Sequence, residues 1–185
     1  MIKYSAIDLQ SLQSIYDTDI LPYEYHYELD DGTFVSVRFE QSQLAHLLGI
    51  QKVDHSRADL KGQKCYDEIR NGNLTFTKLK AINRSRVAQE CKDKMRYFDE
   101  LPNLLDSPDC VEFDVDASGK RTRIRMKFAL KADRSSSGKT LILGVDTTGN
   151  RSDYFPRTWL IKPMGSNILD GQSVRTVVSV QKLLR

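Results

Sequence analysis

The sequence predicts an α+β fold, with an N-terminal β-hairpin and helices first and a four- to five-stranded antiparallel sheet last. Two observations support this prediction: polar and apolar residues alternate at 23–39 and again after residue 110, and helical spacing fills the part between. The 185 residues suffice for one sizeable core. We expect an N-terminal helix within residues 1–22 that packs on a single domain formed by residues 23–185.

The first elements are predicted from spacing and turn residues. Residues 7–16 carry apolar side chains at helical spacing, and residues 23–29 and 33–39 alternate as strands do. Asp31 and Gly32 lie between these two runs, and an Asp-Gly step in this position is typical of a hairpin.

Four helical segments are expected next, and two of them end at a recognisable signal. Residues 41–48 stop at Gly49, and residues 61–70 stop at Asn71 and Gly72. A short helix over 75–81 precedes a longer basic helix over 85–98.

The last third of the chain is strand-like. Short runs rich in β-branched and aromatic residues are separated by Ser, Gly and Asp, and they cover 111–115, 121–131, 140–145, 153–161 and 174–184. The short loops at 135–138 and 147–150 suit antiparallel neighbours.

Charge is distributed unevenly along the chain. The 28 basic and 25 acidic residues give a net charge of only +3. Residues 117–162 nevertheless hold 11 basic and 3 acidic residues, whereas residues 97–116 hold 7 acidic residues and no basic one. Such gathered cations are expected for a polyanionic partner, and ordinary solvated surface charge is the alternative.

One predicted strand concentrates these cations. Alternation over 121–131 places Arg121, Arg123, Arg125 and Lys127 on one face and apolar residues on the other. We expect this cationic ladder to bind the phosphate backbone of RNA. Two alternatives stay open: acidic residues of 97–116 neutralise the ladder, or it is an edge strand charged against aggregation.

No metal or cofactor is expected. Cys65, Cys91 and Cys110 are widely spaced and form no Cys-x-x-Cys pair, and the three histidines lack metal-ligand spacing. No apolar run is long enough to cross a membrane and no secretory signal is visible, so we expect a cytoplasmic protein.

Metal-independent RNA cleavage needs a proton acceptor, a proton donor and a cation beside phosphorus. His46, in the last turn of its predicted helix, fits a general acid or a phosphate contact, and the alternative is a histidine that bonds a free helix carbonyl. His26 and His55 are expected to be structural or exposed. Arg96 could face RNA or pair with a nearby acid.

A proline lies within the strand predicted over 153–161. Alternation alone places Arg157 and Trp159 on one face and Tyr154 and Thr158 on the other. Pro156 interrupts this pattern, because a proline inside a strand implies an edge or a bulge. The face that Arg157 joins is therefore left open.

Four segments, at 39–53, 61–80, 95–105 and 153–161, resemble the fourth of the phage-associated nuclease-like families grouped with barnase, EndoU, colicin-type tRNases and RelE. The resemblance spans roughly residues 23–162. It implies a helix-plus-antiparallel-sheet core and metal-independent RNA cleavage, often by a toxin or in conflict between mobile elements and hosts. It also implies catalytic roles for His46, Arg157 and Thr158, and weaker matches at Tyr154 and Arg96.

We therefore expect a ribonuclease-like protein of phage or mobile-element origin that cleaves or binds an RNA such as tRNA or mRNA without a cofactor. Its other partner would be an antitoxin or a host target. The alternative is a non-catalytic inhibitor of anti-defence type that docks on a host nucleoprotein or defence enzyme. A DNA-binding regulator ranks last, because no helix-turn-helix spacing is present.

Overall fold

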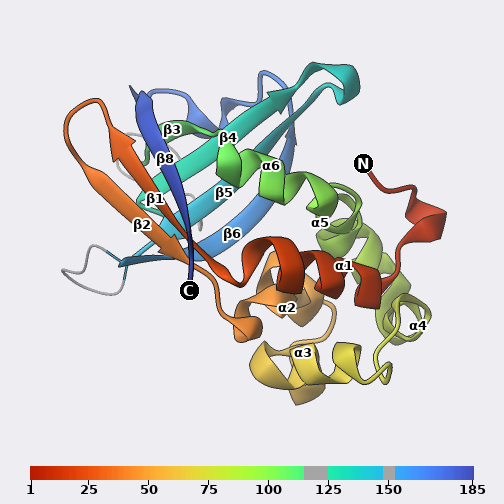
Figure 1. Ribbon diagram of the computed structural model, residues 1–185. Helices are drawn as coiled ribbons and strands as arrows, with labels where there is room; N and C mark the ends of the chain where they lie inside the picture. Colours follow the sequence, from red (N-terminus) through yellow and green to blue (C-terminus); the bar gives the residue numbers. More distant parts are fainter. Residues whose placement is uncertain (115–124, 148–152) are drawn as a thin grey trace. The chain divides into compact units, whose positions relative to one another are not determined.

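The computed structural model describes residues 1–114, 125–147 and 153–185. Two compact units form, and each is built from separate stretches of the chain (Figure 1). The helical unit comprises residues 1–22 and 39–102, and the sheet unit comprises residues 23–38 and 103–185. Arg175 and Ser36 belong to the sheet unit, whereas His46 and Arg96 belong to the helical unit.

The helical unit follows the predicted order closely. Its α-helices are α1 (Leu9–Ile15), α2 (Leu44–Leu47), α3 (Gly62–Arg70), α4 (Phe76–Arg86) and α5 (Lys92–Arg96). Two π-helical turns, Tyr16–Ile20 and Val87–Cys91, extend α1 and join α4 to α5. Short 3-10 turns lie at Tyr4–Ala6, Gln41–Gln43, Ile50–Lys52, Ala58–Leu60 and Phe98–Glu100. The basic helix predicted over 85–98 is thus several shorter segments.

Local capping explains where these helices begin. The carboxylate of Asp8 accepts the backbone N–H of Ser11 at 2.9 Å at the start of α1. Thr75 caps α4 in the same way, through the N–H of Lys78. Within the described ranges, no helix is both long and apolar enough to span a membrane.

Aromatic and amide side chains organise the core of the helical unit. The Tyr16 ring packs against Phe39 and Phe98 with ring centroids 6.2 and 6.3 Å apart. Gln13 is buried, and its amide donates to the carbonyl of Tyr66 at 3.1 Å. Because a buried amide without a partner is costly, this bond fixes α1 against α3.

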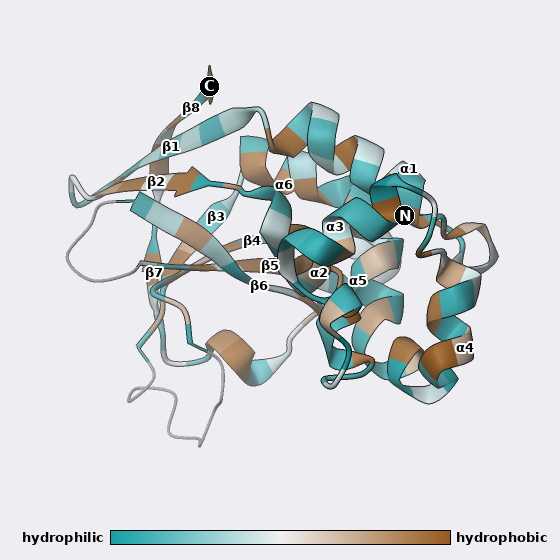
Figure 2. Ribbon diagram, turned by 90° about the horizontal axis from the view of Figure 1, so that it is seen from below, coloured by the Kyte–Doolittle hydropathy of each residue, from teal (hydrophilic) through white to brown (hydrophobic). Residues whose placement is uncertain are grey.

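The sheet unit holds one eight-stranded sheet in the order β7-β3-β4-β5-β6-β2-β1-β8. The strands are β1 (Tyr23–Leu29), β2 (Phe34–Arg38), β3 (Asp109–Glu112), β4 (Phe128–Arg134), β5 (Lys139–Asp146), β6 (Asp153–Pro163), β7 (Ser173–Arg175) and β8 (Val177–Leu184). The short helix α6 (Leu101–Asp106) leads from the helical unit into this sheet. Figure 2 shows the apolar residues of β5 in brown.

The α+β class is confirmed, but the predicted number of strands is too small and the sheet is not wholly antiparallel. The hairpin of β1 and β2 forms as predicted, with Gly32 at a φ of 80°. It does not stand apart, because β2 pairs in parallel with β6 through Ser36 and Asp153. β8 extends the hairpin on its other side, so the two predicted sheet regions are one sheet.

The sheet is curved into a nearly closed barrel. β7 and β8 stand at the two ends of the strand order, yet Thr176 alone separates them in the chain. The guanidinium of Arg175 donates to Glu112 on β3 at 2.6 Å and lies 3.6 Å from Asp31 in the hairpin turn. The N–H of Asp30 donates to the carbonyl of Thr176 at 2.9 Å. These contacts hold the two ends of the sheet together.

A second apolar layer covers part of the outside of the sheet. Val111, Ala129 and Ile142, on three neighbouring strands, form a buried cluster with Phe113 and Met126. Ile168 and Leu169, in a 3-10 turn after β6, pack against this cluster. Both faces of the sheet are therefore apolar here. A sequence pattern in which polar and apolar residues alternate predicts only one apolar face.

Candidate functional site

His46 lies at the carboxyl end of α2, as predicted, and its ring is half-buried. The neighbouring Leu44 and Leu47 are fully buried and anchor the helix in the core. The Nδ1 atom of the imidazole is hydrogen-bonded to the side-chain amide of Gln51. Since Nδ1 is engaged, proton transfer by this ring would pass through Nε2.

Gly49 fixes the backbone just after α2, three residues beyond His46. Its φ is 79°, and a Cβ atom at this position would lie 2.3 Å from the carbonyl oxygen of Glu90. Lys52 pairs with the Glu90 carboxylate at 3.1 Å on the same side. The end of α2 thus packs directly on the π-helical turn before α5, which leaves little freedom for the position of His46.

Arg96 takes part in the packing of the chain's first residues. Its Nε atom lies 3.4 Å from the carbonyl of Ile2, and its Nη1 atom lies 3.9 Å from Asp93. The backbone N–H of Ile2 donates to the Arg96 carbonyl at 2.7 Å. The pairing expected as the alternative to an RNA contact is therefore present.

A β-bulge settles the face that sequence alternation left open on β6. Gly144 pairs with Thr158 and Val145 pairs with Pro156, so Arg157 is the extra residue of the bulge. Arg157 is exposed and Trp159 is fully buried. The bulge that Pro156 indicated is therefore present, and simple alternation does not apply across it.

The other two residues predicted on β6 lie in different surroundings. Tyr154 is 5% exposed and its ring packs edge-on against Phe128, with centroids 5.6 Å apart. This is the environment of a core side chain. Thr158 is half-buried, and its methyl group would lie 2.8 Å from a Cβ atom at Gly144.

The cationic ladder is only partly described. Arg121 and Arg123 lie outside the described residues, whereas Arg125 and Lys127 are exposed just before β4 begins at Phe128. The predicted strand forms from Phe128 onward as β4, and Arg125 and Lys127 precede it. Ala129 belongs to the apolar outer cluster, and Lys131 pairs with Asp109 at 3.4 Å. Asp109 belongs to the acidic segment 97–116, whose pairing with the ladder was the alternative to RNA binding.

Lys127 borders an open pocket in the sheet unit. The pocket has a volume of about 540 Å³ and is lined by Glu112, Phe113, Asp114, Lys127 and Ser173. The ammonium group of Lys127 also lies 5.7 Å from the centre of the Tyr154 ring. A cation, two carboxylates and an aromatic ring thus share this surface.

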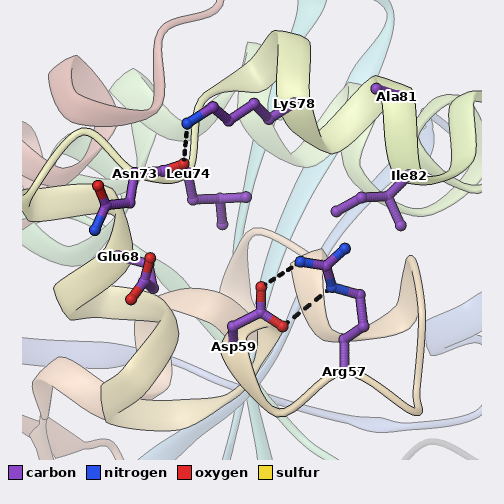
Figure 3. A pocket seen from close by; sticks show the side chains of 8 residues that line it. All are labelled: Arg57, Asp59, Glu68, Asn73, Leu74, Lys78, Ala81 and Ile82. Carbon is purple, nitrogen blue, oxygen red and sulfur yellow. Dashed lines mark hydrogen bonds and ion pairs between the residues drawn. The ribbon is translucent and has the colours of Figure 1, made fainter.

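The helical unit contains a second pocket, of about 340 Å³ (Figure 3). Figure 3 shows two guanidinium nitrogens of Arg57 directed at the carboxylate of Asp59, at 3.1 and 2.6 Å. Lys78 donates to the carbonyl of Asn73 at 2.7 Å. Both cations of this pocket are already engaged by protein oxygens, so we assign it no role.

A polar cluster that sequence reasoning missed lies on the hairpin of the sheet unit. The Nε2 atom of His26 lies 2.9 Å from a carboxylate oxygen of Glu24, and the Ser36 hydroxyl donates to the same oxygen at 2.6 Å. The spacing of Glu24 and His26, two residues apart on one predicted strand, places both on one face. Ser36 could be added only once the hairpin register was known.

The cysteines are poor candidates for covalent chemistry. Cys65, Cys91 and Cys110 are free thiols and are fully buried. Burial raises the pKa of each thiol to about 12. Among the described side chains, no group of three His, Cys, Asp or Glu residues could hold a metal ion.

Comparison with known families identifies the chain. Residues 8–178 match the sequence model of the phage-Barnase-EndoU-ColicinE5/D-RelE like nuclease4 family. The match covers most of the chain, so the protein belongs to this family of nuclease-like proteins. No curated protein and no solved structure matches the chain.

Proposed function

We propose that this protein is a metal-independent endoribonuclease. The observation that supports the proposal best is the family match over residues 8–178, which gives a nuclease-like function in general. The choice of RNA over DNA rests on the chemistry of the residues present. Imidazole and guanidinium groups can cleave RNA through its own 2′-hydroxyl group, and DNA lacks that hydroxyl.

In the proposed reaction, the 2′-oxygen attacks phosphorus and the bond from phosphorus to the 5′-oxygen breaks. A base accepts the 2′-hydroxyl proton and an acid donates a proton to the departing 5′-oxygen. The products are a 2′,3′-cyclic phosphate and a 5′-hydroxyl end. His46 is the proposed proton-transfer group of the helical unit, acting through Nε2 because Gln51 engages Nδ1.

The phosphate contacts are proposed for the sheet unit. Arg157 is exposed at the bulge of β6 and would stabilise the charge that grows on phosphorus. Thr158 would position the phosphate, and the basic segment that includes Arg125 and Lys127 would hold the RNA backbone. We give Tyr154 and Arg96 no catalytic role, since one is a core side chain and the other binds the chain's first residues.

The test is cleavage of a defined RNA by the purified full chain in EDTA. We expect cleavage to persist in EDTA and to fall about 100-fold or more in His46→Ala. His55→Ala is the matched control, because His55 is an exposed histidine of the same unit. Wild-type protein that cleaves no RNA contradicts the function, and a fully active, folded His46→Ala protein contradicts the role of His46.

A second function, a non-catalytic protein that binds a host macromolecule, is favoured by one observation. Val174, Val178 and Leu184 on the terminal strands β7 and β8 are apolar and strongly exposed. A pull-down from host lysate followed by RNA analysis separates the two functions. One stoichiometric protein partner without new RNA ends supports binding alone, and new RNA ends support the enzyme.

A further inference from the structure

One face of the β1–β2 hairpin gathers the groups that phosphodiester cleavage requires. In the register of the hairpin, Glu24 is opposite Arg38, His26 is opposite Ser36, and Glu28 is opposite Phe34. The intervening residues Tyr25, Tyr27, Val35 and Val37 point to the other face and are buried. The first set is therefore the solvent-facing set.

The carboxylate of Glu24 is held in place by two donors. The Ser36 hydroxyl donates to Glu24 Oε1 at 2.6 Å, and His26 Nε2 lies 2.9 Å from the same oxygen. The bond from Ser36 lowers the pKa of Glu24, burial opposes this, and His26 and Arg38 add to the lowering. Glu24 is thus an anion at neutral pH.

An anionic partner determines the tautomer of His26. Because an ionised carboxylate only accepts hydrogen bonds, the Nε2 atom of His26 carries a proton. In the neutral ring, Nδ1 is then the nitrogen that can accept a proton, while the bond to Glu24 holds Nε2 in place. A carboxylate that orients an imidazole in this way is a recurring arrangement for proton transfer.

A cation and an aromatic ring flank this pair. Arg38 and Phe34 occupy the two positions diagonal to His26 on β2, at about 7–8 Å between backbones. That separation leaves room for a phosphate between His26 and Arg38. Phe34 is 64% exposed, unusually open for a large apolar side chain, and presents a ring on which a base can stack.

The hairpin face continues onto neighbouring strands. Ser36 pairs with Asp153 at the start of β6, the strand that later carries Arg157 and Thr158. On the other side, Gln181 of β8 pairs with His26. The hairpin is therefore an internal part of the sheet, and its charged side chains are not explained as protection of an exposed edge.

We propose that the solvent-facing side of the β1–β2 hairpin binds RNA, and that His26, oriented by Glu24, is a proton-transfer group of the cleavage reaction. This rests on the proposed ribonuclease function. Arg38 contacts the phosphate and Phe34 stacks on a base. Glu24, His26, Phe34, Ser36 and Arg38 all belong to the sheet unit.

Binding is tested first, with an RNA oligonucleotide whose 2′-oxygens are methylated so that it cannot be cleaved. We expect its addition to shift the imidazole NMR signals of His26 and to leave those of exposed His55 unchanged. Phe34→Ala and Arg38→Ala should each weaken binding about tenfold. Arg70→Ala removes an exposed arginine of the helical unit and should not weaken binding. Unshifted His26 signals at saturating RNA overturn the binding site.

Cleavage tests the role of His26 separately. We expect His26→Ala to lower kcat about 100-fold or more with little change in KM. Glu24→Gln should lower kcat by a smaller factor. His55→Ala is again the control, and thermal unfolding checks that each variant is folded. A fully active His26→Ala protein overturns the proton-transfer role and leaves the ribonuclease function standing. If the wild-type protein cleaves no RNA, both the ribonuclease function and the proton-transfer role of His26 are overturned. The binding experiment with methylated RNA then still decides whether this face of the hairpin binds RNA.

Discussion

The helical unit and the sheet unit differ in how their structures are determined. The residues that start or stop the helices of the helical unit lie next to those helices in the sequence, as Asp8, Thr75 and Gly49 do. The sheet depends on partners far apart, such as Tyr23 of β1 and Leu184 of β8. Local contacts form early at low entropic cost, whereas distant strands pair only after long loops close. The two units should therefore respond differently to perturbation.

Thiol reactivity gives the largest expected effect. At pH 8, a thiol with a pKa of about 12 is ionised in about one molecule in ten thousand, so all three cysteines should be inert in the native state. Labelling in increasing urea, followed by mass spectrometry, reports each unit separately. Cys65 and Cys91 report on the helical unit and Cys110 on the sheet unit. Identical labelling midpoints for all three would show that the units unfold together.

The substitution Gly49→Ala tests the rigidity of the helical unit. A Cβ atom there meets the Glu90 carbonyl at 2.3 Å in addition to the strain of a φ of 79°. We expect a loss of about 3 kcal/mol in the free energy of unfolding, measured in urea. Gly32→Ala in the hairpin turn is the control, because it has a φ of 80° with nothing within 4 Å. Gly32→Ala should lower the free energy of unfolding by about 1 kcal/mol. Equal losses in the two variants would contradict the role of the Glu90 contact.

The helix cap at Asp8 should have a smaller effect. Asp8→Ala is expected to cost about 1 kcal/mol at pH 7. The hydrogen bond from Ser11 lowers the pKa of Asp8, so its contribution is present above the unfolded pKa and is lost as pH falls through the folded pKa. The difference between wild type and Asp8→Ala should therefore shrink between pH 5 and pH 2. A difference that does not depend on pH would mean that the carboxylate is not the cap.

The smallest effect is expected in the sheet unit, for Ser36→Ala. The hydroxyl of Ser36 is the main cause of the lowered pKa of Glu24, so its removal should raise that pKa, as measured by NMR titration. Glu24 stabilises the fold above its unfolded pKa, and this contribution is lost as pH falls through the folded value. In Ser36→Ala, the loss should begin at higher pH. An unchanged titration would contradict the geometry of the hairpin cluster.

Sequence patterns predicted the parts of the molecule that depend on near neighbours. The hairpin, the helix end at Gly49 and the predicted strands over 140–145 and 153–161 are confirmed. The parallel pairing of β2 with β6 was missed, because the two strands are more than a hundred residues apart and alternation says nothing about partners. The number of strands in the sheet was underestimated for the same reason.

The candidate site shows the same division. His46 was found from its place at a helix end, but its partner Gln51 follows only from the turn that Gly49 allows. Pro156 signalled a bulge, yet only the pairing with β5 shows that Arg157 is the extra residue. The cluster around Glu24 was missed because it joins two strands: alternation places Glu24 and His26 on one face but does not identify Ser36 and Arg38 as their neighbours.

The interleaved path of the chain has a consequence for its synthesis. The helical unit is complete once residue 102 has left the ribosome, whereas β1 must wait for β8, whose last residue is Leu184. Until then, the outer edge of β1 has no partner strand and its aromatic residues lack their final cover. A domain that matures in this order delays any activity of its sheet until translation has passed its last strand.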